Sequence, residues 1–266
     1  MAFWTFLGLM EGKASTRWPR EGGETGQDGV LGMPRFNPAL CAEGCEACAE
    51  VCPTEAITVT VGAEGRDRLE VDYGRCITCQ LCVEACPSEA ATASHDWAFG
   101  VRDRSDLMLS EDSQGASKAA VRPATAFRRS LHVRHVDAGS GNAAESELQA
   151  LGNPFYNLHR LGIFFTPSPR FADLLLVTGP VTSGMRESLL RTYEAMPEPR
   201  WVMACGTAAV SGALTGGGYA AGNGVDDILP VDLYLPGSPP NPAAIIAALL
   251  MFLGRVPQRV KEGQYD

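Results

Sequence analysis

Residues 45–59 of the chain read CEACAEVCPTEAITV, and residues 79–93 repeat that pattern as CQLCVEACPSEAATA, at an offset of 34 positions (79 against 45). In both copies the last cysteine is followed by proline and then by a short stretch rich in alanine, valine or threonine. Internal repeats are the first feature to look for in a sequence. This one predicts two similar halves, each supplying metal ligands and a short element after its Cys-Pro.

Eight of the nine cysteines lie between Cys41 and Cys86. The second run has the spacing Cys-x2-Cys-x2-Cys-x3-Cys-Pro, and the first run has one more residue in its first gap. In the bacterial ferredoxin spacing, three close thiolates hold one cluster and the fourth cysteine reaches the other cluster. We therefore expect two [4Fe–4S] clusters, one on Cys41, Cys45, Cys48 and Cys86, and the other on Cys76, Cys79, Cys82 and Cys52.

Metal ligation explains these cysteines better than disulfides do, because a disulfide framework spreads its cysteines along the chain. The N-terminal stretch MAFWTFLGLMEGK lacks the basic leading region and the cleavage site of a signal peptide. Two zinc sites are the alternative, but zinc is typically held by paired CxxC knuckles that a longer stretch separates.

Composition narrows the classes of function. The chain has 266 residues, 45% of them hydrophobic and 20% charged, as in ordinary globular proteins. Its net charge of −9 makes it a poor nucleic-acid binder, because phosphate neutralisation needs a basic surface. No apolar run approaches the ~20 residues of a membrane span.

The second half alternates strand and helix signals. Short runs rich in Val and Leu occupy 131–136, 172–179 and 200–206, and helical patterns occupy 181–196 and 241–254. Ser183 is the expected N-cap of the first helix, and Pro242 and Gly254 mark the start and end of the second. This order predicts an α/β domain with a parallel sheet and helices on its faces, next to a small α+β domain.

The cysteine-rich stretch resembles the two-cluster ferredoxin-like subunits of complex I and of membrane-bound hydrogenases. The resemblance covers residues 38–92, and FLGLMEGKASTRWP resembles the N-terminal segment of the same subunits. We expect a docking arm at 1–37, the two-cluster domain at 38–92, a linker or draped extension at 93–130, and the α/β domain at 131–266.

The second domain resembles the small subunit of the complex I and energy-converting (group 4) [NiFe]-hydrogenase family. The resemblance rests on SLHVRHVDAGSGNAAESE, NPFYNLHRLGIFFTPSPRFADLLLVTGPVT and DILPVDLYLPGSPPNPAAI. It implies a flavodoxin-like fold that carries one cluster and docks on a large subunit. The family motifs G-S-C-N-G-C, G-x-C-A and P-G-C-P-P have no cysteine here, so we expect no cluster at their positions, which are Gly141, Ala144, Ala208 and Ser238.

Other candidate groups have structural interpretations. We expect Cys205 to be a buried core thiol rather than a redox group, and His132, His135 and His159 to be structural. Asp137, Glu145 and Glu147 are expected to be solvated or interface carboxylates rather than a proton relay. The stretch 216–224 (GGGYAAGNG) lacks a nucleotide-binding register, and Asp226 and Asp227 are expected in a turn.

Two functional hypotheses follow. In the first, the chain is a non-catalytic iron–sulfur electron-transfer subunit of an oxidoreductase complex, with its second domain kept as a docking scaffold. In the second, it is purely a structural adaptor with non-essential clusters. A free-standing enzyme with a ligand in the vacated site is the third alternative. The implied partners are a hydrogenase-like or complex I-like large subunit, membrane-arm subunits and a soluble redox donor, with no nucleic acid. The implied location is cytoplasmic, peripheral on the inner face of the cell membrane.

Overall fold

The computed structural model describes residues 30–61, 67–110, 129–261 and 264–265, together with Phe6 and Met10. Most of the expected docking arm and residues 111–128 of the expected extension lie outside the described residues. The chain divides into two compact units, Met1–Val30 and Leu31–Asp266, and the description below concerns the second.

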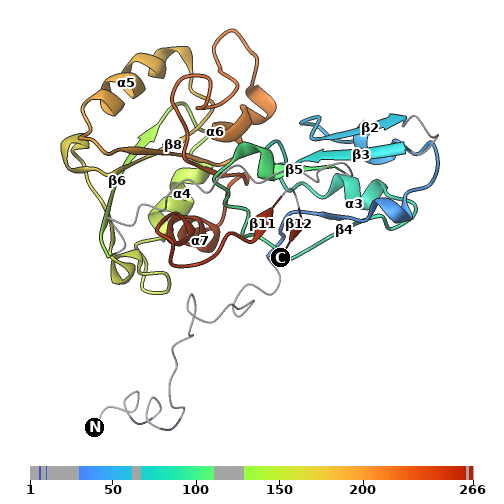
Figure 1. Ribbon diagram of the computed structural model, residues 1–266, viewed down its shortest axis with the longest axis horizontal. Coiled ribbons are helices and arrows are strands. Elements are labelled where there is room, and N and C mark those ends of the chain that lie inside the picture. The colour runs from blue at the N-terminus through green and yellow to red at the C-terminus, as the bar shows by residue number, and fades with distance from the viewer. Residues whose placement is uncertain are drawn as a thin grey trace. The chain divides into compact units, whose positions relative to one another are not determined.

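A five-stranded, wholly parallel sheet forms the centre of the second half, with the strand order β10-β9-β8-β6-β7 (Figure 1). Its strands are β6 (Leu131–Asp137), β7 (Ile163–Phe165), β8 (Leu174–Thr178), β9 (Trp201–Cys205) and β10 (Leu233–Leu235). Numbered along the chain, this order is 2-1-3-4-5, which is the flavodoxin-like topology. The predicted fold class is thereby confirmed.

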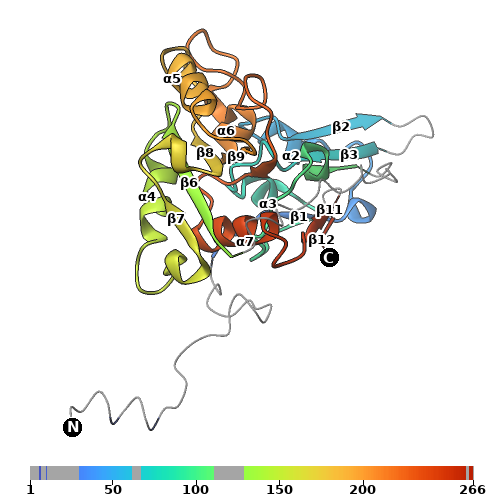
Figure 2. The ribbon, with the colours of Figure 1, turned by 60° about the vertical axis from the view of Figure 1, so that its left-hand side comes forward.

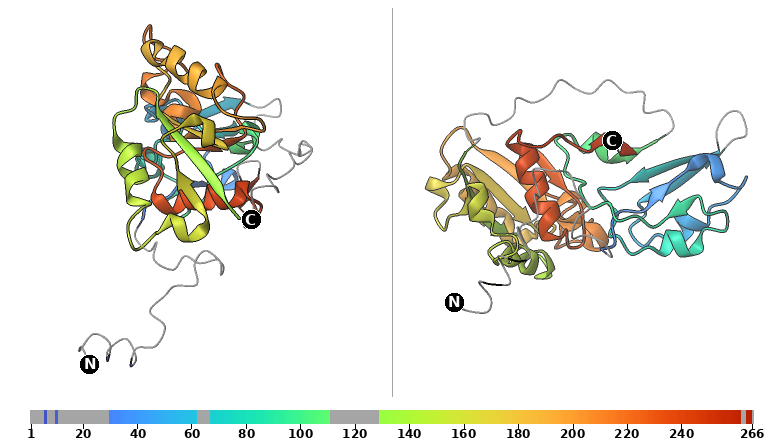
Figure 3. Two further views of the ribbon diagram at one scale, coloured as in Figure 1. Left: turned by 90° about the vertical axis from the view of Figure 1, so that its left-hand side faces the viewer. Right: turned by 90° about the horizontal axis from the view of Figure 1, so that it is seen from below.

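Helices cover both faces of this sheet, with α5 and α6 on one side and α4 and α7 on the other (Figures 2 and 3). The helices are α4 (Ala143–Ala150), α5 (Ser183–Glu194), α6 (Thr207–Ser211) and α7 (Pro242–Phe252). Short 3-10 turns connect them, at η4 (Leu158–Leu161), η5 (Pro169–Phe171) and η6 (Ala213–Thr215). Because both faces are covered, the central strand β8 is buried at every position and its sequence is continuously apolar up to Thr178.

Helix α7 begins as its sequence predicts, and α5 begins one residue away from the predicted position. Asn241 caps α7, its side-chain oxygen accepting the Ala244 N–H at 2.8 Å, and Pro242 stands in the first turn as predicted. For α5 the predicted N-cap was wrong by one residue, because Thr182 is the cap and Ser183 is the first helical residue. The Thr182 side chain makes no cap hydrogen bond, and a difference of one residue is ordinary at a helix end.

The cysteine-rich part consists of two small antiparallel sheets, β1–β4 and β2–β3–β5, with two short helices, α2 and α3. The bounds are β1 (Arg35–Phe36), η1 (Pro38–Leu40), α2 (Ala47–Glu50), β2 (Ile57–Val61), β3 (Asp67–Asp72), α3 (Leu81–Ala85), β4 (Ala91–Thr92), η2 (Arg104–Leu107) and β5 (Met108–Leu109). Each cysteine run therefore forms one short helix, and a strand follows its Cys-Pro.

Residues 93–110 contact both halves of the chain. Phe99, Val101 and Leu107 are fully buried. Val101 forms an antiparallel bridge with Tyr234, with backbone hydrogen bonds of 2.9 and 2.8 Å, and so covers the edge strand β10. Near the C-terminus a last ribbon pairs β11 (Val260–Lys261) with β12 (Gln264–Tyr265). Among the described residues, no helix has both the length and the hydrophobicity to cross a membrane.

Candidate metal centre

The eight clustered cysteines line two separate cavities, four to each. Phe36 contributes to the wall of both. One cavity is lined by Cys41, Cys45, Cys48 and Cys86, and the other by Cys52, Cys76, Cys79 and Cys82. In each set, three cysteines come from one run and the fourth comes from the Cys-Pro of the other run.

The two cavities have equivalent surroundings, as the internal repeat predicts. The Cys52 sulfur accepts the Ala56 N–H at 3.2 Å, and the Cys86 sulfur accepts the Ala91 N–H at 3.4 Å. Thr54 Oγ1 and Ser88 Oγ lie 3.7 and 3.8 Å from the same two sulfurs.

Both Cys-Pro turns also contain a glutamate in the left-handed region, Glu55 at φ 51° and Glu89 at φ 56°. Peptide N–H groups that point at a thiolate stabilise its negative charge. These turns are therefore suited to ligands of an anionic cluster, whose potential such hydrogen bonds tune.

Each cavity is lined by four cysteines. Within the described ranges, no three His, Cys, Asp or Glu side chains come close enough together to hold one metal ion. The all-thiol donor sets and the amides aimed at sulfur fit an iron–sulfur cluster, in which each thiolate binds a different iron.

The free thiols are weak acids in these positions. Burial raises the pKa of Cys76 to about 12 and that of Cys82 to about 11. Without a metal, both side chains are neutral thiols at pH 7. A metal held by these sulfurs as thiolates would therefore displace their protons.

The vacated positions of the small-subunit motifs lie at the carboxyl edge of the parallel sheet. Gly141 and Ala144 follow β6, Ala208 follows β9, and Ser238 follows β10. The edge between β6 and β8 is the topological switch point, where open α/β sheets bind their ligands. The loops pack closely here, because Gly179 has φ +83° and a Cβ on it would lie 2.6 Å from the Ser140 nitrogen.

A buried carboxylate lies directly beside these vacated positions. Glu145 accepts hydrogen bonds from Ser140 Oγ, at 2.5 Å, and from Thr178 Oγ1. His135 Nε2 lies 3.0 Å from Thr178 Oγ1 and 3.6 Å from Glu145 Oε1. Burial lowers the pKa of His135, and the neighbouring Glu145 charge opposes that effect without reversing it.

Of the two alternatives expected for Glu145, a solvated or an interface carboxylate, the solvated one is wrong, because Glu145 is only 9% exposed. Its position in the first turn of α4 and two hydroxyl donors satisfy the charge. Asp137 is exposed and accepts the N–H groups of Gly139 and Ser140. The helical period on α4 could have identified Glu145 as a buried residue, because Glu145 lies three residues before the buried Leu148 and therefore on the same face of the helix.

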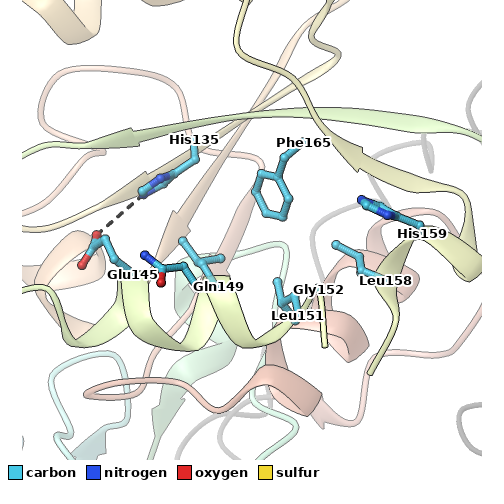
Figure 4. A pocket seen from close by; sticks show the side chains of 9 residues that line it. His135, Glu145, Gln149, Leu151, Gly152, Leu158, His159 and Phe165 are labelled. Atoms are coloured by element: carbon cyan, nitrogen blue, oxygen red, sulfur yellow. Dashed lines mark ion pairs between the residues drawn. The ribbon is translucent and has the colours of Figure 1, made fainter. Parts of the chain in front are cut away.

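Figure 4 shows a cavity of about 370 Å³ beside this cluster, between α4 and the strands β6 and β7. His135 and Glu145 point toward one another at one end, and Phe165, Leu158 and Leu151 form its apolar walls. His159 lies at the far end and stacks on Phe164, with ring centroids 5.4 Å apart.

The remaining candidates behave as structural residues. Cys205 is a buried thiol, as predicted, and burial raises its pKa to about 12. His132 lies 3.6 Å from Asp173 Oδ2 and stacks on Phe164. Asp226 and Asp227 lie in a turn, as predicted.

Comparison with known proteins matches both parts of the chain. Residues 40–90 match the 4Fe–4S dicluster domain family, and residues 141–252 match the family of the NADH ubiquinone oxidoreductase 20 kDa subunit. Formate hydrogenlyase subunit 7 of Escherichia coli (strain K12) is 37% identical over 164 residues, covering 60% of this chain and 64% of that relative. The match thus spans slightly less than two thirds of the relative's length.

A solved structure of the membrane-bound sulfane sulfur reductase, an archaeal respiratory membrane complex, contains a chain with 31% identity and a TM-score of 0.43. That match covers 53% of this chain and 79% of the other. The two family matches follow one another along the sequence without overlap, and they agree with the resemblances drawn from the cysteine runs and the α/β motifs. The chain therefore joins a 4Fe–4S dicluster ferredoxin domain to a domain similar to the complex I 20 kDa subunit.

Proposed function

We propose that this chain is an electron-transfer subunit of a hydrogenase-like or complex I-like assembly, with two [4Fe–4S] clusters and a second domain that has no cluster of its own. The first cluster is held by Cys41, Cys45, Cys48 and Cys86, and the second by Cys76, Cys79, Cys82 and Cys52. The observation that carries the proposal is the division of the eight thiols into two sets of four around separate cavities. The clusters supply one-electron carriers, and the chain's own residues orient them and exclude water.

The second domain serves in this proposal as a docking scaffold. Its four vacated positions carry a glycine, two alanines and an exposed serine, none of which supplies a thiolate. The parallel sheet is complete, and each strand from β6 to β10 carries buried residues. The partners are a large subunit and membrane-arm subunits, with a soluble protein as electron donor, and the chain is peripheral on the cytoplasmic face of the membrane.

The test is the metal content of the chain purified without oxygen. We expect about eight irons and eight acid-labile sulfides per chain from two cubanes. Zinc in place of iron contradicts the cluster assignment. About twelve irons contradicts the absence of a cluster in the second domain.

The second candidate is a purely structural adaptor, which the intact fold around the vacated positions favours. The two candidates differ in what happens when a cluster is lost. Copurification of the large and membrane-arm subunits should survive Cys79→Ala in both cases. Electron transfer through the assembly should survive it only if the clusters are non-essential. The same preparation identifies the partners and shows whether the large subunit keeps nickel-binding cysteines.

A further inference from the structure

A buried hydroxyl connects the second cysteine cavity to the α/β domain. Thr207 is the first residue of α6 and has no exposed surface. Its Oγ1 donates a hydrogen bond of 2.8 Å to the backbone carbonyl of Cys76, which lies 131 residues earlier in the chain. Thr207 also stands next to Ala208, one of the vacated ligand positions. The link therefore joins the cavity of Cys76 to the loop that in related proteins carries a cysteine.

The orientation of this hydroxyl is fixed from the other side. Thr207 Oγ1 accepts the Gly237 N–H at 2.9 Å, and the Thr207 N–H donates to the Gly237 carbonyl at 2.8 Å. Because the oxygen already accepts one hydrogen bond from the loop after β10, its own hydrogen is directed at Cys76. The result is a chain of two hydrogen bonds, from the Gly237 N–H to Thr207 Oγ1 and from Thr207 Oγ1 to the Cys76 carbonyl.

We propose that Thr207 is a positioning residue that holds the Cys76 ligand in place and sets the reduction potential of the cluster in the second cavity. This rests on the proposed function, in which Cys76 is a ligand of that cluster. The hydroxyl hydrogen places positive partial charge against the peptide of the ligand. It thereby favours the added electron of the reduced cluster, and burial keeps water from screening the effect.

The perturbation is Thr207→Val, which keeps the shape of the side chain and removes the donor. We expect the midpoint potential of one cluster to become more negative, while the other cluster titrates as in the wild type. Thr207→Ser keeps a hydroxyl and should restore the wild-type value. Ser211→Ala is the matched control, because Ser211 lies one turn further along α6 and donates only to the Thr207 carbonyl.

Two further variants identify which cluster moves. Thr54 Oγ1 lies near the Cys52 sulfur of the second cavity, and Ser88 Oγ lies near the Cys86 sulfur of the first. Thr54→Val should shift the same redox step as Thr207→Val, and Ser88→Ala should shift the other step. Electron paramagnetic resonance during a redox titration of the full-length protein follows both steps separately.

The inference and the proposed function fail in different ways. If wild-type protein carries no iron, the proposed function is wrong and the inference falls with it. If about eight irons are present and Thr207→Val leaves both steps unchanged, only the inference is wrong. It is also overturned if Thr207→Ser shifts the potential as far as Thr207→Val, or if the shifted step is the one that Ser88→Ala moves.

Discussion

Returning thiols to the four vacated positions tests the proposal that the second domain lost only its metal. The variant combines Gly141→Cys, Ala144→Cys, Ala208→Cys and Ser238→Cys. We expect iron to rise from about eight to about twelve per chain, which is one additional cubane and a 1.5-fold increase. The reason is that the loops after β6, β9 and β10 still meet at the carboxyl edge of an intact sheet.

The structure gives each new side chain room. A Cβ on Gly141 meets no heavy atom within 4 Å, and the backbone there is outside the left-handed region. Ala144 and Ala208 are half-buried, and Ser238 is exposed, so the sulfurs displace no core side chain. Each substitution should change the free energy of unfolding by less than about 1 kcal/mol, as is usual for positions outside the core.

The assay is iron and sulfide analysis after anaerobic reconstitution, with circular dichroism to show that the fold is retained. The matched control replaces Ala208→Cys by Ser211→Cys, which puts the fourth thiol one turn away on the same helix, and it should stay at about eight irons. A folded quadruple variant that also stays at about eight irons would refute the reasoning, because the loops would then no longer form a cluster site.

Three further predictions concern single residues. Cys79→Ala should reduce iron from about eight to about four per chain by removing the second cluster, and circular dichroism should show the α/β domain still folded. Arg102→Ala should lower the free energy of unfolding by about 2 kcal/mol, because its guanidinium donates to two carbonyls at the end of α7 at 3.1 and 2.8 Å. Denaturant titration measures this loss. The control Arg191→Ala should lower the free energy of unfolding by less than about 0.5 kcal/mol, because its ion pair is exposed. Burial lowers the pKa of His135 below its usual 6.5 in the folded protein. As the pH falls below 6.5, the unfolded chain therefore takes up a proton before the folded protein does, and the free energy of unfolding should decrease. Denaturant titrations at several pH values should show a weaker pH dependence for His135→Gln.

The secondary structure was predictable where hydrophobic residues recur at regular spacing along the sequence. The runs at 131–136, 172–179 and 200–206 are strands, and Asn241 and Pro242 start the last helix where their chemistry places them. The spacing of the two cysteine runs predicts two sets of four ligands, because in the ferredoxin pattern the Cys-Pro of each run reaches the neighbouring site. The sets of four that line the two cavities agree with that spacing.

Features that depend on long-range packing were not visible in the sequence. Residues 93–110 have little periodicity, yet Phe99 and Val101 are fully buried. The helical period places Glu145 on the buried side of α4, but it does not predict the hydrogen bond that Thr178 of β8 donates to the Glu145 carboxylate. The hydrogen bond from Thr207 to Cys76 joins residues from the two family domains. No local pattern predicts such contacts, since they form only when separate elements meet.

The two halves of the chain are stabilised by different interactions. This difference supports the proposal that the second half is a scaffold without a cluster. The hydrogen bonds around the vacated positions come from Asp137, Ser140, Glu145 and Thr207, none of which occupies a ligand position. A domain without thiols at these positions would therefore still have its loops hydrogen-bonded beside a buried parallel sheet. In the described part of the cysteine-rich half, the strands are short and the two helices, α2 and α3, each have about one turn. A segment this small gains much of its stability from bound metal. Removal of iron should therefore unfold residues 38–92 while the sheet from β6 to β10 keeps its shape for docking.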